Sequence, residues 1–253
     1  MRSVADSFGV ALDFVSVPVE AFSSFPVADH VSHAAYYRLI GPEVLPATIQ
    51  RLLYLDCDIV ALGAVDDLWD FEMDGATMAA VRDFSNFDRF ESLQIPRGAP
   101  YFNSGVLLID CPLWRTENVT KRCMEYIAEN PDKVVFWDQD ALNHVVCGRW
   151  KQLDPVWNLQ ALAYLLPELD SLRRELEPQC RLMHYSSPSK PWEFVNEHPR
   201  KREYSRVLAR SPWKGWTPSD ATPIRRIKRF LFSILPSPLR AKASAWIKAR
   251  QLR

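Results

Sequence analysis

Two aspartates separated by one residue, Asp56 and Asp58, directly follow the apolar run 51–55. In an extended chain, residues i and i+2 project to the same side, so both carboxylates can face one ion. Ligands of open α/β sheets bind beyond the carboxyl ends of strands, which is where this pair would lie. Carboxylate oxygens suit Mn²⁺ or Mg²⁺, and such an ion would bridge to phosphate oxygens. The pair therefore predicts a metal site for a phosphate-bearing ligand, although two aspartates after a strand also cap turns.

Three later segments combine polar side chains with apolar runs. They are YFNSG at 101–105, WDQDALN at 137–143 and HYSSPSKPW at 184–192. His184 ends an apolar run, where it is either a metal ligand or a structural histidine. Lys190 would offset the charge of a leaving diphosphate, or it is an ordinary surface charge. Asp138 lies where it can serve a reacting centre or cap the helix that follows it.

The elements that must position these residues mix strands and short helices. Strands are predicted over 9–17, 51–56, 78–81, 105–109 and 180–185, and helices over 33–40, 114–129 and 138–146. The first helix should end near Gly41 and Pro42. The continuous apolar run before Asp56 favours a strand covered on both faces, as in the middle of a parallel sheet. We expect one α/β sheet domain, and Asn103, at the start of its strand, shares a crevice with Asp56 only if that sheet is mixed.

Taken in order with YLDCD at 54–58, these motifs closely resemble those of family 8 glycosyltransferases, over roughly Arg2 to Trp192. The resemblance implies a GT-A fold, in which a mixed sheet flanked by helices merges with an acceptor-binding part. It also implies transfer of glucose or galactose from a UDP-sugar, with retention of anomeric configuration. The acceptor would be a glycolipid, a lipopolysaccharide or another polysaccharide. The cofactor would be Mn²⁺, with Mg²⁺ as the alternative.

The resemblance assigns roles to individual residues. It implies Asp56, Asp58 and His184 as metal ligands, Arg38, Asp83, Asn103, Ser187 and Lys190 as donor- or substrate-binding residues, and Asp138 and Gln139 at the reacting centre. Retention leaves two routes, a covalent intermediate on an enzyme side chain or same-face attack by the acceptor, and the sequence chooses neither. Arg38 also fits an ordinary helix-face charge, and Asp83 also fits a simple ion pair with Arg82. Ser187 stands where the family usually has glycine, so its side chain would either crowd the phosphates or donate a hydrogen bond to them.

The sequence also departs from the family pattern. Family members begin with a strand that ends in a motif such as Ala-x-Asp-Asp-Asn-Tyr, and no such segment precedes Arg51. We therefore expect the first strand–helix–strand unit to be absent, and a catalytically inactive sugar-nucleotide-binding protein is one alternative. The segment DCDIV at 56–60 also resembles the nucleophile loop of haloacid-dehalogenase-type phosphatases, whose later Gly-Asp-x-x-x-Asp motif is not found.

Charge is distributed unevenly along the chain. Lys plus Arg and Asp plus Glu both number 31, so the whole molecule offers no net field for nucleic acid. No acidic residue follows Asp220, and residues 223–253 alternate Arg and Lys with Ile, Leu, Phe and Trp in two short amphipathic helices. This composition is typical of an interfacial helix on an anionic membrane, or the apolar face docks on the protein. The predicted domains are 1–220, the glycosyltransferase domain, and 221–253, a basic membrane-associating tail.

The five cysteines are scattered without metal-site or redox spacing, which indicates free thiols in a reducing compartment. The first six residues contain no apolar signal region, and no stretch is long enough to span a bilayer. We therefore expect a cytoplasmic protein that is peripheral on the cytoplasmic membrane face through its tail.

Overall fold

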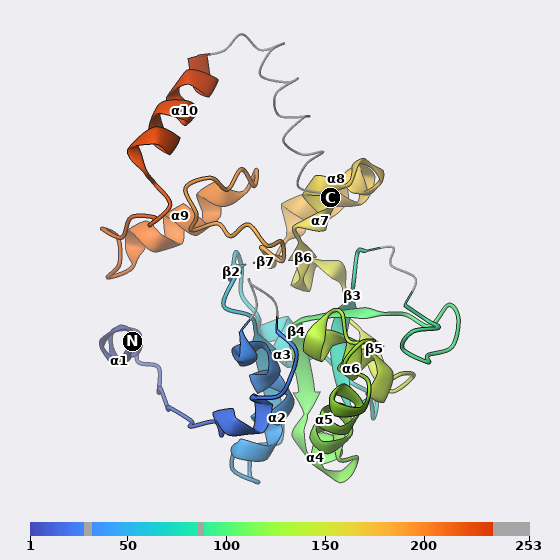
Figure 1. The fold of residues 1–253 in the computed structure, drawn as a ribbon. Coiled ribbons are helices and arrows are strands. Elements are labelled where there is room, and N and C mark those ends of the chain that lie inside the picture. The colour runs from blue at the N-terminus through green and yellow to red at the C-terminus, as the bar shows by residue number, and fades with distance from the viewer. Residues whose placement is uncertain (28–31, 86–88, 235–253) are drawn as a thin grey trace. The chain divides into compact units, whose positions relative to one another are not determined.

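The computed structural model of the 253-residue chain describes residues 1–27, 32–85 and 89–234. The chain forms two compact units, Met1–Pro188 and Ser189–Arg253. The first unit contains both sheets and is the part that holds the Asp56–Asp58 pair (Figure 1). The boundary expected at residue 220 divides the chain by function, into a catalytic part and a tail, and it stays a prediction.

The larger sheet of the first unit is mixed. It contains β1 (Arg51–Leu55), β3 (Met78–Arg82), β4 (Phe102–Asp110) and β5 (Trp150–Gln152), in the order β1-β4-β3-β5. β4 is antiparallel to β1 and β3, whereas β3 and β5 are parallel. Leu55, the last residue of β1, pairs with Val106 in the middle of β4, and the Asp56 N–H donates to the Gly105 carbonyl, so the first half of β4 continues past the end of β1 beside Asp56. This is the arrangement that brings Asn103, near the start of β4, to the crevice at Asp56.

The smaller sheet contains β2 (Ile59–Ala61), β6 (Leu159–Gln160) and β7 (Leu182–His184), in the order β2-β7-β6. β2 and β7 are antiparallel, and Ile59 pairs with His184. β6 and β7 are parallel. Residues 56–58 are the connection between β1 and β2, so the aspartate pair lies where the chain passes from one sheet to the other.

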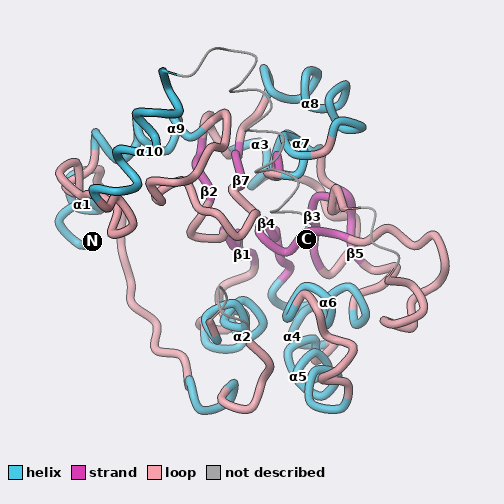
Figure 2. The backbone as a smooth tube through the Cα atoms, turned by 45° about the horizontal axis from the view of Figure 1, so that its top comes forward, coloured by secondary structure: helices cyan, strands magenta, loops and turns pink. Residues whose placement is uncertain are grey.

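Four helices gather on one side of the larger sheet (Figure 2). They are α2 (Tyr37–Val44), α4 (Cys111–Thr116), α5 (Val119–Glu129) and α6 (Trp137–Val145). Leu107 and Ile109, which alternate along β4, pack into the core beneath these helices together with Trp114. Eight of the nine residues of β4 are buried. Burial of one such large side chain stabilises the fold by about 1.5–3 kcal/mol, so this core fixes β4 and the polar residues at its start.

The remaining described helices of the first unit are short. They are α1 (Arg2–Ser7), α3 (Asp66–Trp69), α7 (Leu162–Leu165) and α8 (Asp170–Leu176), with 3-10 turns at Val19–Phe22, His33–Tyr36, Pro155–Trp157, Pro167–Leu169 and Glu177–Gln179. The five cysteines are free thiols, as expected.

The second unit contains α9 (Lys201–Arg210) and α10 (Pro223–Ile234). The Asp220 carboxylate accepts hydrogen bonds from the backbone N–H of Phe194 (2.8 Å) and Val195 (3.2 Å), and it pairs with Arg225 at 3.3 Å. These contacts tie the residues before α10 to the segment before α9. No helix within the described ranges is long and apolar enough to cross a membrane. The second predicted tail helix, around 239–250, lies outside the described residues.

Two predicted elements differ at the N-terminal side. The predicted strand 9–17 is irregular extended chain, with Phe14 63% and Val15 46% exposed. Its alternating pattern describes an extended backbone, but a strand also needs a hydrogen-bonded neighbour, and none pairs with it in the described structure. The helix expected to end near Gly41 continues through Pro42 to Val44. Arg115 donates to the carbonyl of Pro42 (2.8 Å) and so satisfies a group that the helix end would leave open.

Two further predictions need correction in the sheet and its cover. β1 is antiparallel to β4, which is its described neighbour, so it is not the middle strand of a parallel arrangement. Its first four residues are half-buried rather than covered on both faces. The predicted helix 114–129 is two helices, α4 and α5, because Asn118 between them adopts a left-handed conformation with φ of 53°.

Candidate active site

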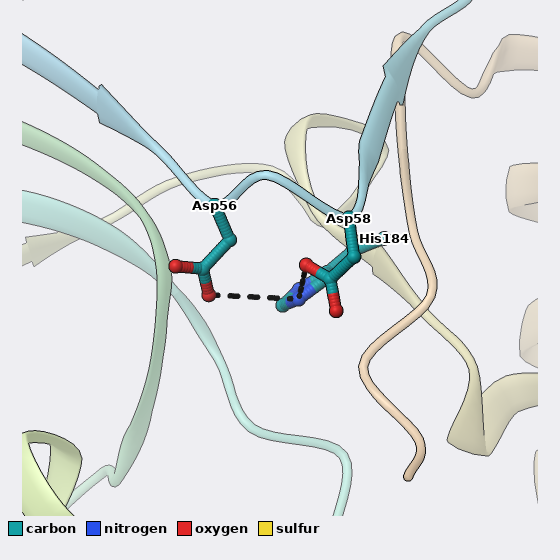
Figure 3. Close-up of side chains that lie close together, drawn as sticks. All are labelled: Asp56, Asp58 and His184. Atoms are coloured by element: carbon teal, nitrogen blue, oxygen red, sulfur yellow. Dashed lines mark ion pairs between the residues drawn. The ribbon is translucent and has the colours of Figure 1, made fainter. Parts of the chain in front are cut away.

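Asp56, Asp58 and His184 converge at the junction of the two sheets. Their ligand atoms all lie within 4.8 Å of one another. His184 Nε2 is 3.2 Å from Asp58 Oδ1 and 3.7 Å from Asp56 Oδ2. Figure 3 shows the three side chains pointing toward one another, the two aspartates from the connection after β1 and the histidine from the end of β7. The sequence motifs 128 residues apart thus meet in one cluster.

The cluster fits a divalent cation. Two carboxylates and one imidazole nitrogen form a donor set that Mn²⁺ accepts, and oxygen-rich sets also suit Mg²⁺. Gly105 of β4 packs directly against this set. A Cβ at Gly105 would lie 2.2 Å from His184 Cε1 and 3.0 Å from Asp56 Oδ2. The backbone of β4 therefore forms a wall of the site that only a residue without a side chain can supply.

Arg38 lies beside the cluster and is buried. Its Nη2 donates to Asp56 Oδ1 (2.8 Å), and its Nε is 3.0 Å from Asp138 Oδ2. Its Nη1 donates to Ser104 Oγ at 2.9 Å. Burial alone would lower the pKa of Arg38, but the Asp138 and Asp56 carboxylates raise it above its usual value. Arg38 is therefore a permanent cation that holds two carboxylates in place, rather than the solvated helix-face charge that its position in the sequence also allowed.

Tyr54 fixes the other side of Asp56. Its hydroxyl donates to Asp56 Oδ1 at 2.8 Å. Burial and the neighbouring Asp56 raise the pKa of Tyr54, so the hydroxyl keeps its proton at neutral pH. Tyr54 and Arg38 Nη2 both bind Oδ1, whereas the second oxygen, Oδ2, faces His184 and also lies 3.5 Å from Arg38 Nη1.

Asp138 is almost completely buried in the first turn of α6. Burial raises the pKa of Asp138 to about 6, while the positive charge of Arg38 opposes the shift. Ser104 Oγ donates to Asp138 Oδ2 at 2.8 Å. The N-cap of the helix is Phe136, so the interpretation of Asp138 as a helix cap is wrong. Its carboxylate instead holds Arg38 and Ser104.

Asn103, Gln139 and Asp83 form a second hydrogen-bonded group. The Asp83 Oδ2 oxygen accepts from Asn103 Nδ2 (3.2 Å) and from Gln139 Nε2 (3.1 Å). Gln139 Oε1 accepts from the backbone N–H of Ser104 at 3.1 Å. Asp83 therefore joins two residues of the candidate site, Asn103 and Gln139, in place of the simple pairing with Arg82 that the sequence also allowed. The amides of Asn103 and Gln139 are therefore held in defined orientations.

Two further residues, Ser187 and Lys190, were predicted to bind the donor. Ser187 is half-buried on the loop three residues after His184. Lys190 belongs to the second unit, where its backbone N–H donates to Glu193 Oε2 at 3.2 Å. Their roles in donor binding stay predictions.

Several residues that hold the site together were not predicted from the sequence. Tyr54 lies two residues before Asp56, and the same-side rule for i and i+2 in a strand would have found it. Ser104 lies inside the motif YFNSG at 101–105, but no role was predicted for its hydroxyl. Asn158 is fully buried, with Oδ1 2.9 Å from His184 Nδ1 and Nδ2 2.9 Å from Asn103 Oδ1. No spacing pattern connects Asn158 to the other motifs, so only the fold identifies it.

Comparisons with known proteins agree on one family. The family model described as Glycosyl transferase family 8 matches residues 7–196. General stress protein A of Bacillus subtilis is 33% identical over 215 residues, which is 81% of this chain and 75% of that protein. Lipopolysaccharide 1,3-galactosyltransferase of Salmonella typhimurium is 27% identical over 220 residues, 84% of this chain and 65% of that protein.

Among solved structures, the galactosyltransferase LgtC, crystallised with donor and acceptor sugar analogues, superposes with a TM-score of 0.70 and 25% identity. The match covers 82% of this chain and 77% of that chain. It confirms the expected fold class, a mixed sheet flanked by helices of the GT-A type.

Proposed function

The chain belongs to glycosyl transferase family 8 and is a glycosyltransferase, and on this premise we propose that it is a retaining hexosyltransferase. The donor is UDP-glucose or UDP-galactose, and the acceptor is the saccharide of a lipopolysaccharide, another glycolipid or a polysaccharide. The observation that carries the proposal is the convergence of Asp56, Asp58 and His184 beside the fixed amides of Asn103 and Gln139. Relatives named lipopolysaccharide galactosyltransferase and glucosyltransferase support this acceptor class.

The leaving diphosphate determines what the site must do. Asp56, Asp58 and His184 hold Mn²⁺, or alternatively Mg²⁺, which when bound offsets the negative charge that develops on the diphosphate. Lys190 adds a second positive charge, and Ser187 donates a hydrogen bond to a phosphate oxygen. Arg38 supports the donor site through Asp56, whose orientation it fixes.

The sugar-binding side is built from residues that are already oriented. Asn103 and Gln139 present amide groups to the sugar, and their shared partner Asp83 keeps those groups from reorienting. Polar groups fixed before the reaction stabilise developing charge without reorganising. Asp138 keeps Arg38 and Ser104 in position behind them. Retention requires the acceptor hydroxyl to attack the sugar from the face that UDP leaves. It attacks either after an enzyme side chain has formed a covalent intermediate on the opposite face, or directly, from the same face as the leaving UDP.

Calorimetric titration with UDP, with and without Mn²⁺, tests the metal and donor site. We expect Mn²⁺-dependent binding by the wild type and by Asp132→Asn, which removes an exposed carboxylate. Asp58→Asn should lose the Mn²⁺-dependent part while keeping its circular dichroism spectrum. Equal UDP affinity with and without Mn²⁺, or unchanged binding by Asp58→Asn, would contradict the metal site.

Transfer assays test the reaction itself. UDP-glucose and UDP-galactose are offered with lipopolysaccharide acceptors of different length, and proton NMR reads the anomeric configuration of the new bond. The proposal predicts the α configuration of the donor in the product. Metal-dependent UDP binding without transfer would instead favour the sugar-nucleotide-binding protein that lacks activity. Family membership already selects the transferase over the phosphatase interpretation of Asp56 and Asp58.

The tail, residues 221–253, attaches the protein to the anionic cytoplasmic face of a membrane. In α10 the side chains of Ile224, Ile227 and Phe230 are 67%, 59% and 64% exposed, next to Arg225 and Arg226. Exposed apolar side chains flanked by basic ones are the composition of an interfacial helix, and basic residues gain about 1 kcal/mol each near an anionic surface. Attachment through this tail places the enzyme near a lipid-linked acceptor.

Vesicle pelleting tests this attachment. The variant in which Ile224, Ile227 and Phe230 are all replaced by Gln removes exposed side chains and should not disturb packing. We expect it to lose binding to vesicles containing anionic lipid. Val207→Gln, at a half-exposed position of α9, is the matched control and should bind as the wild type does. Equal pelleting by the triple variant and the wild type would contradict the membrane role.

A further inference from the structure

A chain of hydrogen bonds runs from the backbone of β4 to the imidazole of His184, and its first members have fixed polarity. The backbone N–H of Gly105 lies 3.1 Å from Asn103 Oδ1 and is a donor only. On the other side of the amide, Asn103 Nδ2 lies 3.2 Å from the Asp83 carboxylate, which is an acceptor only. Both neighbours therefore require the same orientation of the Asn103 side chain, with its oxygen toward Gly105.

The orientation of Asn103 determines that of Asn158. The Asn103 oxygen lies 2.9 Å from one end of the Asn158 amide, so that end must be the donating Nδ2. The other end, the acceptor Oδ1, is then the atom 2.9 Å from His184 Nδ1. Asn158 is fully buried, and its reversal would set two acceptors against each other at Asn103. A buried polar group without a partner costs roughly 1–3 kcal/mol. The chain of hydrogen bonds is therefore stable in only one assignment of donors and acceptors.

The same polarity determines which nitrogen of His184 carries the proton. Because Asn158 Oδ1 accepts, Nδ1 must donate, and Nε2 of the neutral ring then has its lone pair free. That lone pair faces Asp58 Oδ1 at 3.2 Å and Asp56 Oδ2 at 3.7 Å. In this tautomer, three acceptor atoms, one from each of the three residues, point toward the position that a cation would take.

We propose that Asn158 is a positioning residue, which selects the Nδ1–H tautomer of His184 and so presents Nε2 to the metal. Outer partners of this kind orient a histidine ligand and typically change metal affinity by about 10–100-fold when they are removed. The competing Nε2–H tautomer would donate to Asp58 or Asp56 and close the site. The metal half of this proposal rests on the function proposed above, whereas the tautomer half does not.

Asn158 also links the two halves of the site. Its Nδ2 binds Asn103, one of the amides proposed to contact the donor sugar, and its Oδ1 binds the metal-ligand histidine. A displacement of Asn103 is therefore transmitted to His184 through a single buried side chain. This arrangement keeps the sugar-binding amides and the metal ligands in one fixed relation.

Nitrogen-15 NMR of histidine-labelled, metal-free protein tests the tautomer directly. His184→Gln assigns the His184 signals among the five histidines. For the neutral ring of His184 in the wild type, we expect a protonated Nδ1 and an unprotonated Nε2. A proton on Nε2 in the neutral wild-type ring would overturn the proposal without any Asn158 variant and whether or not the protein binds Mn²⁺.

Two variants then separate the functions of the two ends of the Asn158 amide. Asn158→Leu removes the acceptor, so we expect the Nε2–H tautomer to appear and Mn²⁺ affinity to fall by about 10–100-fold. Asn158→Asp keeps an acceptor opposite Nδ1, so the Nδ1–H tautomer should persist. Electron paramagnetic resonance of free Mn²⁺ measures the affinities, and circular dichroism checks folding. A folded Asn158→Leu protein with the wild-type tautomer and affinity would refute the role of Asn158.

If the wild type binds no Mn²⁺, the proposed metal site fails, and the tautomer measurement still decides the role of Asn158. If Asn158→Leu does not fold, the wild-type spectrum and Asn158→Asp decide it.

Discussion

At the scale of single residues, Asp56 shows how a site can be built from conflicting charges. One of its oxygens accepts from Tyr54 and Arg38, and the other faces His184. Arg38 in turn lies between Asp56 and the buried Asp138. A buried cation between two carboxylates offsets their mutual repulsion, and removal of one member of such a group is costly. The charged residues are therefore interdependent, and each has a measurable effect on its neighbours.

Asp138 should give the protein a characteristic pH dependence. Burial raises its pKa from 3.8 to about 6, so the folded protein binds this proton more tightly than the unfolded chain. The free energy of unfolding that it contributes therefore falls as pH rises from about 4 to about 6. Asp138→Asn removes this loss. We expect the difference in free energy of unfolding between the variant and the wild type to change in favour of the variant as pH rises from about 4 to about 7, by at most roughly 3 kcal/mol, whatever the constant cost of removing the carboxylate. Denaturant unfolding across this range measures it, and parallel pH profiles would contradict it.

Gly105 should tolerate no side chain. A Cβ there would lie 2.2 Å from Cε1 of His184, whose ring is buried and bonded to Asn158. Gly105→Ala must displace the ring, and we expect Mn²⁺ affinity to fall by about tenfold or more. Gly215→Ala is the control, since a Cβ at Gly215 meets nothing within 4 Å. Equal Mn²⁺ affinity of both variants and the wild type would show that the contact at Gly105 does not position His184.

At the scale of elements, the sequence predicted which segments come together because the motifs lie at strand ends. The aspartate pair after β1 and the histidine at the end of β7 both follow apolar runs, and the fold brings them together. The requirement of a mixed sheet followed from Asn103 alone, and the antiparallel pairing of β4 with β1 meets it. Strand ends are predictable because apolar periodicity changes there to polar residues.

The parts that the sequence did not predict depend on long-range partners. The segment 9–17 has a strand pattern without a ladder neighbour, and no local pattern reports whether a neighbour exists. The helix through Pro42 persists with the help of Arg115, which lies 73 residues further along the chain. Asn158 acquires its role only when three separate segments meet. These features follow from tertiary contacts rather than from propensity or spacing.

The break between α4 and α5 should depend on Asn118. This residue has φ of 53° and ψ of 40°, a conformation that asparagine and glycine adopt more readily than other residues. We expect Asn118→Ala to lower the free energy of unfolding by about 1 kcal/mol, and Asn118→Gly to have little effect. Urea unfolding measures both variants. If the alanine variant were as stable as the glycine variant, the left-handed turn would not be what separates the two helices.

At the scale of the whole molecule, the zero net charge conceals two opposite charges. Before Ser189 the chain has 15 Lys and Arg against 27 Asp and Glu, and from Ser189 onward it has 16 against 4. The first unit is therefore acidic and the second is strongly basic. A basic unit favours an anionic surface, whereas the acidic unit would be repelled from it.

Membrane attachment should therefore weaken with salt. The screening length falls from about 10 Å at 0.1 M salt to about 3 Å at 1 M, so attraction between the second unit and anionic lipid should decrease across this range. We expect pelleting of the full chain with anionic vesicles to fall as NaCl is raised, and little pelleting with neutral vesicles at any salt. If pelleting did not depend on salt with either vesicle type, electrostatic attraction would be contradicted. Insertion of apolar side chains would then be the sole cause of membrane binding.

The connection 56–58 joins the two sheets. The Asp56 backbone N–H donates to the Gly105 carbonyl of β4 in the larger sheet at 2.9 Å, and the Asp58 carbonyl accepts from the Tyr185 backbone N–H in the smaller sheet at 3.0 Å. An ion held by Asp56, Asp58 and His184 would therefore cross-link the two sheets. Local opening of β7 would have to break metal–ligand bonds, and the two sheets would open as one cooperative unit. Amide protons of β2 and β7 should then exchange with deuterium more slowly in the presence of Mn²⁺. The exchange rates of these amide protons would then report whether the metal site is occupied.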